Sequence, residues 1–222
     1  MADMNIVNTN ILQITLTMTN VFTKKTLDKF AKQVPELESA LRNAKIKLEP
    51  SHQPPFNMLV RSILYQQLAY KAAKTIHDRF LELVGQLTPT RVLAKTQEEL
   101  RSVGLSRQKA SYIHNVAEAF GRGGFLWKYR KTESLSELST AEITALFSKI
   151  KGVGIWTVQM YLIFALGRLD VIAAGDLGVR KGVMKLYGLA EVPTQKQVEE
   201  IAKKWHPLET VGTYLAWRSV DD

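Results

Sequence analysis

The stretch that decides the fold covers residues 140–180 and reads TAEITALFSKIKGVGIWTVQMYLIFALGRLDVIAAGDLGVR. Its first part predicts a helix, and residues 155–166 predict a second helix that is apolar nearly all round and should therefore be buried. Between the two helices, Gly152 and Gly154 flank one small apolar residue, which allows a tight hairpin whose backbone N–H groups point outward. Such N–H groups at the start of a helix form an anion site.

The hairpin is followed by a loop, residues 170–180, that delivers Asp176 to the start of a further helix. Asp176 fits the role of an N-cap, which Asp fills without any catalysis. A Gly-Val-Gly turn likewise occurs between helices that bind nothing, so these residues alone leave both a structural and a functional role open.

The chain on either side of this stretch also has helical patterns. Capping boxes mark three helix starts, at Thr96 with Glu99, Ser139 with Glu142, and Thr194 with Gln197. No alternating strand pattern follows residue 22, whereas residues 1–22 are rich in Asn and Thr and are either strand-like or irregular.

The sequence therefore predicts an all-α, compact, two-lobed domain over residues 23–222, with the helical hairpin at residues 142–166, after a short lead-in at residues 1–22.

Composition narrows the possible functions. The 222 residues include 30 Lys and Arg against 21 Asp and Glu, a formal charge of +9. This surplus favours a phosphate-bearing partner, although a simple solvated surface also explains it. The absence of cysteine excludes disulfides, thiolate nucleophiles and cysteine-held metal clusters, and the four histidines show no metal-ligand spacing.

Location and membrane contact follow from the apolar pattern. No apolar run approaches the roughly 20 residues that a membrane span needs, and the N-terminus has no secretion signal. We therefore expect an intracellular protein without a membrane partner.

Two motifs carry a resemblance to a known family. The segments KGVGIWT (151–157) and DLGVR (176–180) resemble the helix–hairpin–helix DNA glycosylases, and in particular the 3-methyladenine DNA glycosylase II branch, which removes alkylated bases. Further segments resemble this branch in the same order: FNMLVRSI (56–63), QQL (66–68), KAA (71–73), GLSRQKA (104–110), WHP (205–207) and YLAWR (214–218). The resemblance covers roughly Leu27 to Ser219.

The chain departs from the family pattern at three positions and in its lead-in. Family members usually carry a proline where this chain has Ala173, and often a second acid where it has Gly175. An arginine often stands at the position of Glu209, and the lead-in has no matching segment.

The resemblance implies a role for each of several residues. Asp176 would stabilise the positive charge that develops on the sugar as the base leaves, and would orient or deprotonate water. Leu68, or its neighbour Ala69 or Tyr70, would fill the gap that a flipped base leaves in the duplex. The implied DNA contacts are Lys151, Gly152, Val153, Gly154, Thr157, Ser106 and Lys109. The implied walls of the base pocket are Trp156, Tyr161 and Trp217.

The resemblance also implies the reaction type and the partners. Relatives that cut the DNA strand use a lysine at the position of Trp156, so we expect a monofunctional enzyme without lyase activity. No cofactor is expected beyond a monovalent cation at the hairpin. The expected partner is double-stranded DNA containing damaged bases, bound by a monomeric protein.

Three other functions compete with this one. A non-catalytic helix–hairpin–helix module would explain the hairpin and the charge, but it has no need of an acid that repels phosphate. A helical scaffold for proteins explains neither feature. A glycosylase for mismatched or oxidised bases fits the Gln-Gln-Leu and Trp-x-Pro segments less well.

Overall fold

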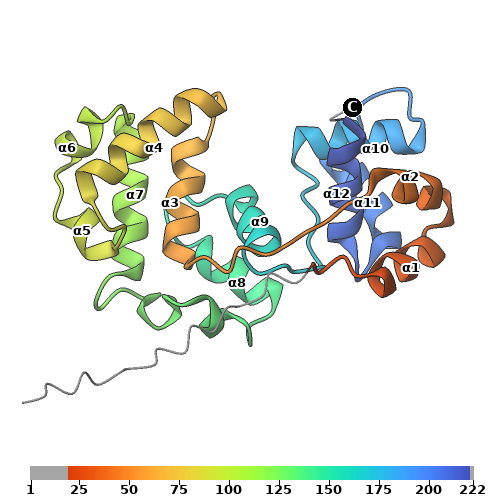
Figure 1. Ribbon diagram of the computed structural model, residues 1–222, viewed down its shortest axis with the longest axis horizontal. Coiled ribbons are helices and arrows are strands. Elements are labelled where there is room, and N and C mark those ends of the chain that lie inside the picture. Colours follow the sequence, from red (N-terminus) through yellow and green to blue (C-terminus); the bar gives the residue numbers. More distant parts are fainter. Residues whose placement is uncertain (1–19, 221–222) are drawn as a thin grey trace, which may run out of the picture.

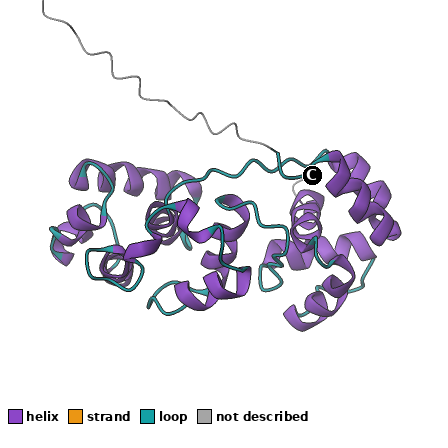
Figure 2. Ribbon diagram, turned by 90° about the horizontal axis from the view of Figure 1, so that it is seen from below, coloured by secondary structure: helices purple, strands orange, loops and turns teal. Residues whose placement is uncertain are grey.

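The computed structural model describes residues 20–220, and every regular element among these residues is a helix, as the sequence predicts (Figures 1 and 2). Most of the lead-in, including its strand-like stretch, falls in residues 1–19 and so lies outside the described residues. Phe22, however, is buried and packs edge-on against Tyr214, with 5.2 Å between the ring centroids. Residues 20–22 are thus part of the packed domain.

The helices form two lobes that lie side by side (Figure 1). The larger lobe contains α3 (Pro55–Tyr65), α4 (Tyr70–Val84), α5 (Pro89–Leu93), α6 (Gln97–Ser102), α7 (Arg107–Phe120), the 3-10 helices η2 (Trp127–Tyr129) and η3 (Thr132–Leu135), α8 (Thr140–Phe147) and α9 (Ile155–Phe164). The smaller lobe contains α1 (Lys24–Gln33), η1 (Pro35–Leu37), α2 (Glu38–Ala44), α10 (Leu177–Tyr187), α11 (Gln195–Ala202), η4 (Lys203–Trp205) and α12 (Glu209–Val220). Both ends of the described chain therefore build the smaller lobe.

Three helices begin at the capping boxes that the sequence predicts. The side chains of Thr96, Ser139 and Thr194 each accept a hydrogen bond from the backbone N–H three residues later, and the side chain of that later residue accepts one from the backbone N–H of the cap. These reciprocal bonds satisfy N–H groups that a helix start leaves without partners. They fix the starts of α6, α8 and α11, and α8 is the first helix of the predicted hairpin.

Within the smaller lobe, α10 and α12 pack so closely that their backbones are in contact. A Cβ atom at Gly182 would lie 2.0 Å from the carbonyl oxygen of Ala216, so this contact requires a glycine. The close approach has a consequence for function. It brings Asp176, directly before α10, next to Trp217, which follows Ala216 on α12.

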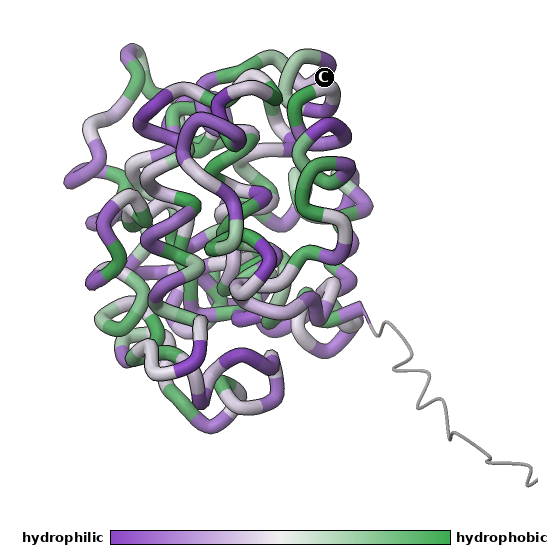
Figure 3. Tube along the Cα trace, turned by 90° about the vertical axis from the view of Figure 1, so that its left-hand side faces the viewer, coloured by the Kyte–Doolittle hydropathy of each residue, from purple (hydrophilic) through white to green (hydrophobic). Residues whose placement is uncertain are grey.

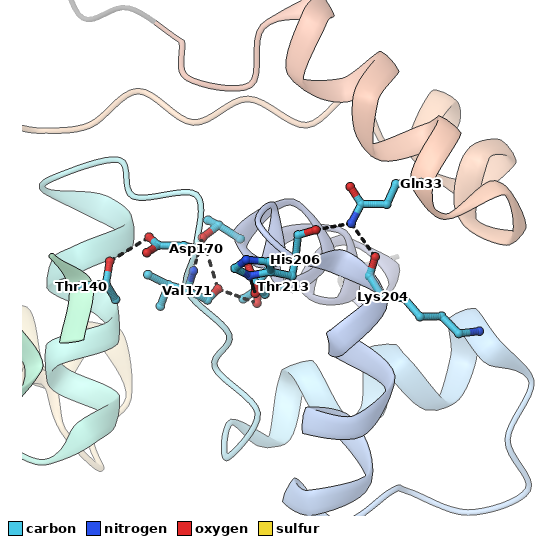
Figure 4. A network of polar contacts seen from close by, with 9 residues as sticks. Gln33, Thr140, Asp170, Val171, Lys204, His206 and Thr213 are labelled. Atoms are coloured by element: carbon cyan, nitrogen blue, oxygen red, sulfur yellow. Dashed lines mark hydrogen bonds and ion pairs between the residues drawn. The ribbon is translucent and has the colours of Figure 1, made fainter.

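Two linkers, residues 45–54 and 165–176, connect the lobes (Figure 1). The first linker bonds to the end of α9 and to the second linker, since Ser51 N donates to the carbonyl oxygen of Phe164 at 2.8 Å and His52 N to that of Ala165 at 3.3 Å. Figure 4 shows how the second linker is tied to α8, because Thr140 Oγ1 donates to Asp170 Oδ1 at 2.8 Å. The linkers are thus hydrogen-bonded parts of the fold.

Hydrophobic and hydrophilic residues alternate along the helical turns (Figure 3), as amphipathic helices on a common core require. The second hairpin helix, α9, is largely buried, as predicted, except that its first two residues, Ile155 and Trp156, are exposed. No helix in the described part of the chain is long and apolar enough to cross a bilayer.

Candidate active site

Asp176 lies at the N-terminus of α10, at the junction between the two lobes. Its Oδ1 atom accepts a hydrogen bond from Val179 N at 3.0 Å, so Asp176 is the N-cap of α10. Its own N–H donates to the carbonyl oxygen of Ala173 at 2.9 Å and closes the preceding turn. The turn therefore forms although Ala173 stands where relatives usually have proline.

Two tryptophan side chains donate to the same carboxylate. Trp156 Nε1, from α9, lies 2.8 Å from Asp176 Oδ2, and Trp217 Nε1, from α12, lies 3.0 Å from Asp176 Oδ1. Capping of α10 needs the bond to Val179 alone, so it does not account for the indole donors. The arrangement fixes the carboxylate in one orientation, with a donor from each lobe.

An aromatic wall surrounds Trp217. Its ring stacks on Phe164, with 5.9 Å between centroids and 17° between the planes, and Tyr214 packs edge-on against it. Burial raises the pKa of Tyr214, so its hydroxyl stays neutral. A recess of about 360 Å³ adjoins these rings, lined by Lys45, Ile46, Lys47, Phe164, Tyr214, Trp217 and Arg218. Aromatic faces of this kind stack on flat rings and attract cations.

Tyr161 lies away from this wall, which corrects the sequence prediction. The side chain is 1% exposed and packs on Phe147 in the core, at 5.3 Å between centroids. Burial raises the pKa of its hydroxyl. The physical reason is helical geometry, because five positions along α9 turn a side chain by about 140° away from Trp156.

The hairpin between α8 and α9 is shaped by residues of α7. Gly152 has φ +103°, and a Cβ atom there would lie 2.1 Å from Tyr112 Cγ. Asn115 Nδ2 donates to the carbonyl oxygen of Lys151 at 2.9 Å. By contrast, a Cβ atom at Gly154 would meet nothing within 4 Å. The turn is therefore packed on one side and open on the other, where the first N–H groups of α9 lack helical partners.

Two residues predicted to contact DNA lie inside the fold. Val153 is buried, and its N–H is used within the turn, since it donates to the carbonyl oxygen of Ile150 at 3.0 Å. Thr157 is 2% exposed, and its Oγ1 accepts a hydrogen bond from Gln66 Nε2 at 3.1 Å. Lys151 and Gly154 are exposed, so they remain the candidates for phosphate contact at the hairpin.

Of the two predicted DNA contacts at the start of α7, one is exposed and the other is bonded within the protein. Ser106 is exposed and caps α7, with Oγ accepting from Lys109 N at 3.2 Å. The Lys109 ammonium group is instead engaged within the protein, because Nζ donates to the carbonyl oxygens of Leu64 and Gln66, each at 2.8 Å. Ser106 therefore remains available to a phosphate, while Lys109 is bonded to the end of α3.

Leu68 lies in the turn between α3 and α4, residues 66–69. The turn places Gln67 at φ +55°, a left-handed conformation uncommon for a residue with a side chain. Leu68 is 40% exposed and Tyr70 is 66% exposed, so this turn presents apolar side chains to solvent. A protruding apolar group is what a duplex-filling wedge requires.

Several residues of the site were missed by sequence reasoning. Tyr112 and Asn115 support the hairpin, Gln66 joins the turn to α9, and Phe164 backs Trp217. A signal existed for the first two, since residues 109, 112 and 115 are spaced to share one face of a helix.

Glu209, at the position of the family arginine, pairs its Oε1 with His206 Nδ1 at 2.8 Å.

Two helices joined by an open hairpin turn, with a carboxylate held at the junction of two lobes, place this chain in the class of helix–hairpin–helix proteins. Residues 60–207 match the HhH-GPD superfamily of base excision DNA repair proteins, and the chain belongs to this family.

Known relatives support this assignment over most of the chain. The chain is 34% identical over 168 residues to DNA-3-methyladenine glycosylase 1 of Schizosaccharomyces pombe, covering 74% of this chain and 72% of the relative. The crystal structure of a DNA-3-methyladenine glycosidase from Bacillus halodurans has a TM-score of 0.78 at 32% identity, covering 89% of this chain and 90% of that one. The S. pombe 3-methyladenine DNA glycosylase Mag1 in complex with abasic DNA has a TM-score of 0.73 at 30% identity, covering 87% and 95%.

Proposed function

We propose that this protein is a monofunctional DNA glycosylase that hydrolyses the N-glycosidic bond of alkylated purines, of the 3-methyladenine type, in duplex DNA. The reaction would start base excision repair. The observation that carries the proposal is the Asp176 carboxylate, which receives indole N–H donors from both lobes. The names of the S. pombe and B. halodurans relatives support the choice of substrate.

Binding would begin at the surface that presents the hairpin and the exposed turn. The first N–H groups of α9, with Gly154 and Lys151 beside them, would receive a phosphate of the strand to be repaired. The target nucleotide would leave the stack, at a cost of a few kcal/mol that is smallest for damaged or poorly paired bases. Leu68 would occupy the gap that remains in the duplex.

Chemistry would follow at the flipped nucleotide. The bond between C1′ and the base nitrogen breaks, its electron pair leaves with the base, and positive charge develops on the sugar. An alkylated purine that is already cationic departs as a neutral base, so no general acid is required. The Asp176 carboxylate would stabilise the sugar cation, orient the water that forms the new bond to C1′, and take up the proton that this water loses. Trp156 and Trp217 would hold that carboxylate in place.

The side chain at position 156 supports the proposal of monofunctional chemistry. A lyase needs an amine that attacks C1′ and forms a Schiff base. Trp156 offers an indole N–H that is already donated to Asp176 Oδ2. We therefore expect base removal that leaves an intact strand with an abasic site.

A monovalent cation at the hairpin would need backbone carbonyl oxygens as ligands. The carbonyl oxygens of Ile150 and Lys151 each accept one hydrogen bond and retain a second lone pair. These two groups fit such an ion, which would add positive charge next to the bound phosphate. Because the substrate is DNA, we further propose that the protein acts inside the cell, as a monomer.

The test compares wild-type protein with Asp176→Asn on methylated duplex DNA. Asparagine also caps helices well, so this variant should fold. We expect methylated purine to be released by the wild type, release by Asp176→Asn to be at least about 100-fold slower, and strand breaks to appear only after alkali. Duplex binding without release by either protein would favour the non-catalytic module instead. Strand cleavage without alkali would contradict the monofunctional assignment.

A further inference from the structure

The ammonium group of Lys109 bonds to the end of α3. Nζ donates to the carbonyl oxygens of Leu64 and Gln66, both at 2.8 Å. Burial lowers the pKa of Lys109, and no carboxylate among the described residues pairs with its ammonium group. A helix C-terminus carries carbonyl oxygens without helical partners and partial negative charge, so a cation there supplies both donors and charge.

The segment directly beyond these carbonyls is the wedge turn, defined here as residues 66–69. Gln66 has φ −54° and ψ 132°, and Gln67 has φ +55°. These angles are close to a type II turn, which normally has glycine or asparagine at the second central position. A turn with glutamine there persists only where the surrounding structure holds it.

The wedge turn is fixed from two helices. Lys109, on α7, bonds to the carbonyl oxygen of Gln66, and Thr157, on α9, accepts a hydrogen bond from the Gln66 side chain at 3.1 Å. Backbone and side chain of one residue are therefore anchored to different helices. The next two residues hold the strained position and the exposed Leu68.

A wedge must keep its position while a duplex closes around it, since a base pair left intact would exclude it. Anchoring Gln66 through both its carbonyl oxygen and its side chain meets this requirement. The ammonium group has three N–H donors and uses two of them here. A lysine that only attracts phosphate keeps its ammonium group in solvent, whereas this one is bonded to two carbonyl oxygens of the protein.

We propose that Lys109 is a positioning residue that fixes the wedge turn, and that it acts on base flipping through Leu68 and not as a phosphate contact. This inference rests on the proposed function, because base flipping is the step that the wedge serves. It replaces the expectation from the sequence that Lys109 binds DNA directly.

The salt dependence of duplex binding separates the two roles. Loss of one phosphate contact reduces the slope of log affinity against log salt by about one. Lys109→Met removes the donors, and Lys25→Met on α1 is the control for the change in net charge. We expect Lys109→Met to change the slope by less than about 0.3, like the control. A reduction near one would overturn the proposal.

Two further readouts report on the wedge itself. With 2-aminopurine beside an abasic site, the fluorescence increase on binding measures unstacking, and single-turnover release of methylated purine measures the complete reaction. We expect Lys109→Met to weaken the fluorescence increase and to slow release by about 10- to 100-fold, as small displacements of catalytic geometry do. Lys109→Arg keeps the charge but changes the donor geometry, and should also be slow. Its rate would equal that of wild type if Lys109 served only as a charge.

A double-mutant cycle shows whether Lys109 acts through Leu68. If it does, Lys109→Met combined with Leu68→Ala should be no more than about twofold slower than Leu68→Ala alone, because the wedge is already gone. Independent, multiplicative losses would overturn the proposal, as would a silent Leu68→Ala. Should the wild type release no methylated purine, the proposed function fails, while the fluorescence and salt measurements still test Lys109.

Discussion

At the scale of single residues, Gly152 and Gly154 belong to one turn but meet opposite demands. Gly152 has φ +103° and no room for a Cβ atom beside Tyr112. Gly154 has φ −82° and open space around it. The fold therefore requires the first glycine, whereas the second leaves the turn open to whatever approaches from outside.

We predict that alanine separates these two roles. Gly152→Ala should lower the free energy of unfolding by about 1–3 kcal/mol, because backbone strain and contact with Tyr112 add up. Gly154→Ala should change the free energy of unfolding by less than about 0.5 kcal/mol, yet weaken duplex binding, because its methyl group would stand between the N–H groups of α9 and a phosphate. Urea unfolding and duplex titrations measure the two effects. Equal losses of stability would contradict the assignment.

A second prediction concerns the indole donors to Asp176. Trp217→Phe keeps an aromatic ring against Phe164 but removes the donor to Oδ1. A hydrogen bond to a charged group is worth about 1.5–3 kcal/mol, so single-turnover release should slow by about 10- to 100-fold. Duplex affinity should stay within about twofold, since no phosphate contact is lost.

Trp127→Phe is the matched control, because it makes the same chemical change in η2 and the indole donors to Asp176 are Trp156 and Trp217. A release rate for Trp217→Phe equal to that of the control would show that the indole donor does not support the carboxylate.

Asp176 shows what single residues reveal in a sequence. Its position before an expected helix indicated an N-cap, the family resemblance implied a catalytic acid, and the structure shows the cap together with two indole donors. Those donors come from residues 20 and 41 positions away, a proximity that no local pattern contains. Tyr161 was misplaced because an almost wholly apolar helix such as α9 has no pattern that marks its exposed face.

At the scale of elements, α3 and α4 pack against each other through the imidazole of His77, a group that titrates. Tyr65 packs on His77 at 5.6 Å between ring centroids, and its hydroxyl lies 3.4 Å from His77 Nδ1. Burial is the main cause that lowers the pKa of His77, and Arg61 and Lys74 add to it, while Asp78 opposes it. The native state therefore prefers a neutral imidazole.

This preference predicts the pH dependence of stability. As pH falls through the ordinary histidine range near 6.5, the unfolded chain takes up a proton before the native protein does, so stability falls until the lower native pKa is passed. His77→Gln should reduce the fall in Tm between pH 7.5 and pH 5. His52→Gln, in the linker, is the control. An unchanged acid-side fall in His77→Gln would show that His77 does not contribute.

Elements differ in how far the sequence predicts them. Capping boxes predict the starts of α6, α8 and α11 correctly, because a box is a local pair of hydrogen bonds. The wedge turn gave no such signal. Gln67 adopts a glycine-like conformation because contacts from α7 and α9 hold its neighbour, and these contacts exist only in the folded protein.

At the scale of the whole molecule, the site exists because two lobes meet. Trp156 belongs to the larger lobe and Trp217 to the smaller one, and Asp176 ends the linker between them. In the smaller lobe, Gln33 on α1 donates through Nε2 to the carbonyl oxygens of Lys204 and His206 (Figure 4). These hydrogen bonds join α1 to the segment directly before α12.

The second linker is attached to α12 by two buried threonines, which leads to the last prediction. Thr210 Oγ1 accepts from Val171 N at 3.1 Å and donates to the carbonyl oxygen of Arg168 at 2.8 Å. Thr213 Oγ1 donates to the carbonyl oxygen of Val171 at 3.3 Å, an atom that Thr210 Oγ1 also approaches, at 3.2 Å. Thr210 thus accepts a hydrogen bond from a backbone N–H. Thr213 only donates, to a carbonyl oxygen that Thr210 also approaches (Figure 4 shows Val171 and Thr213).

Valine at either position keeps the shape of the side chain and removes its hydroxyl group, but the consequences differ. Thr210→Val leaves the N–H of Val171 buried without a partner, which should lower the free energy of unfolding by about 1–3 kcal/mol. Thr213→Val leaves no donor unpaired and should cost less than about 1 kcal/mol. Urea unfolding measures both. Because Asp176 follows Val171 by five residues, Thr210→Val should also slow base release more than Thr213→Val does. Equal stability losses would show that the linker does not depend on this hydrogen bond.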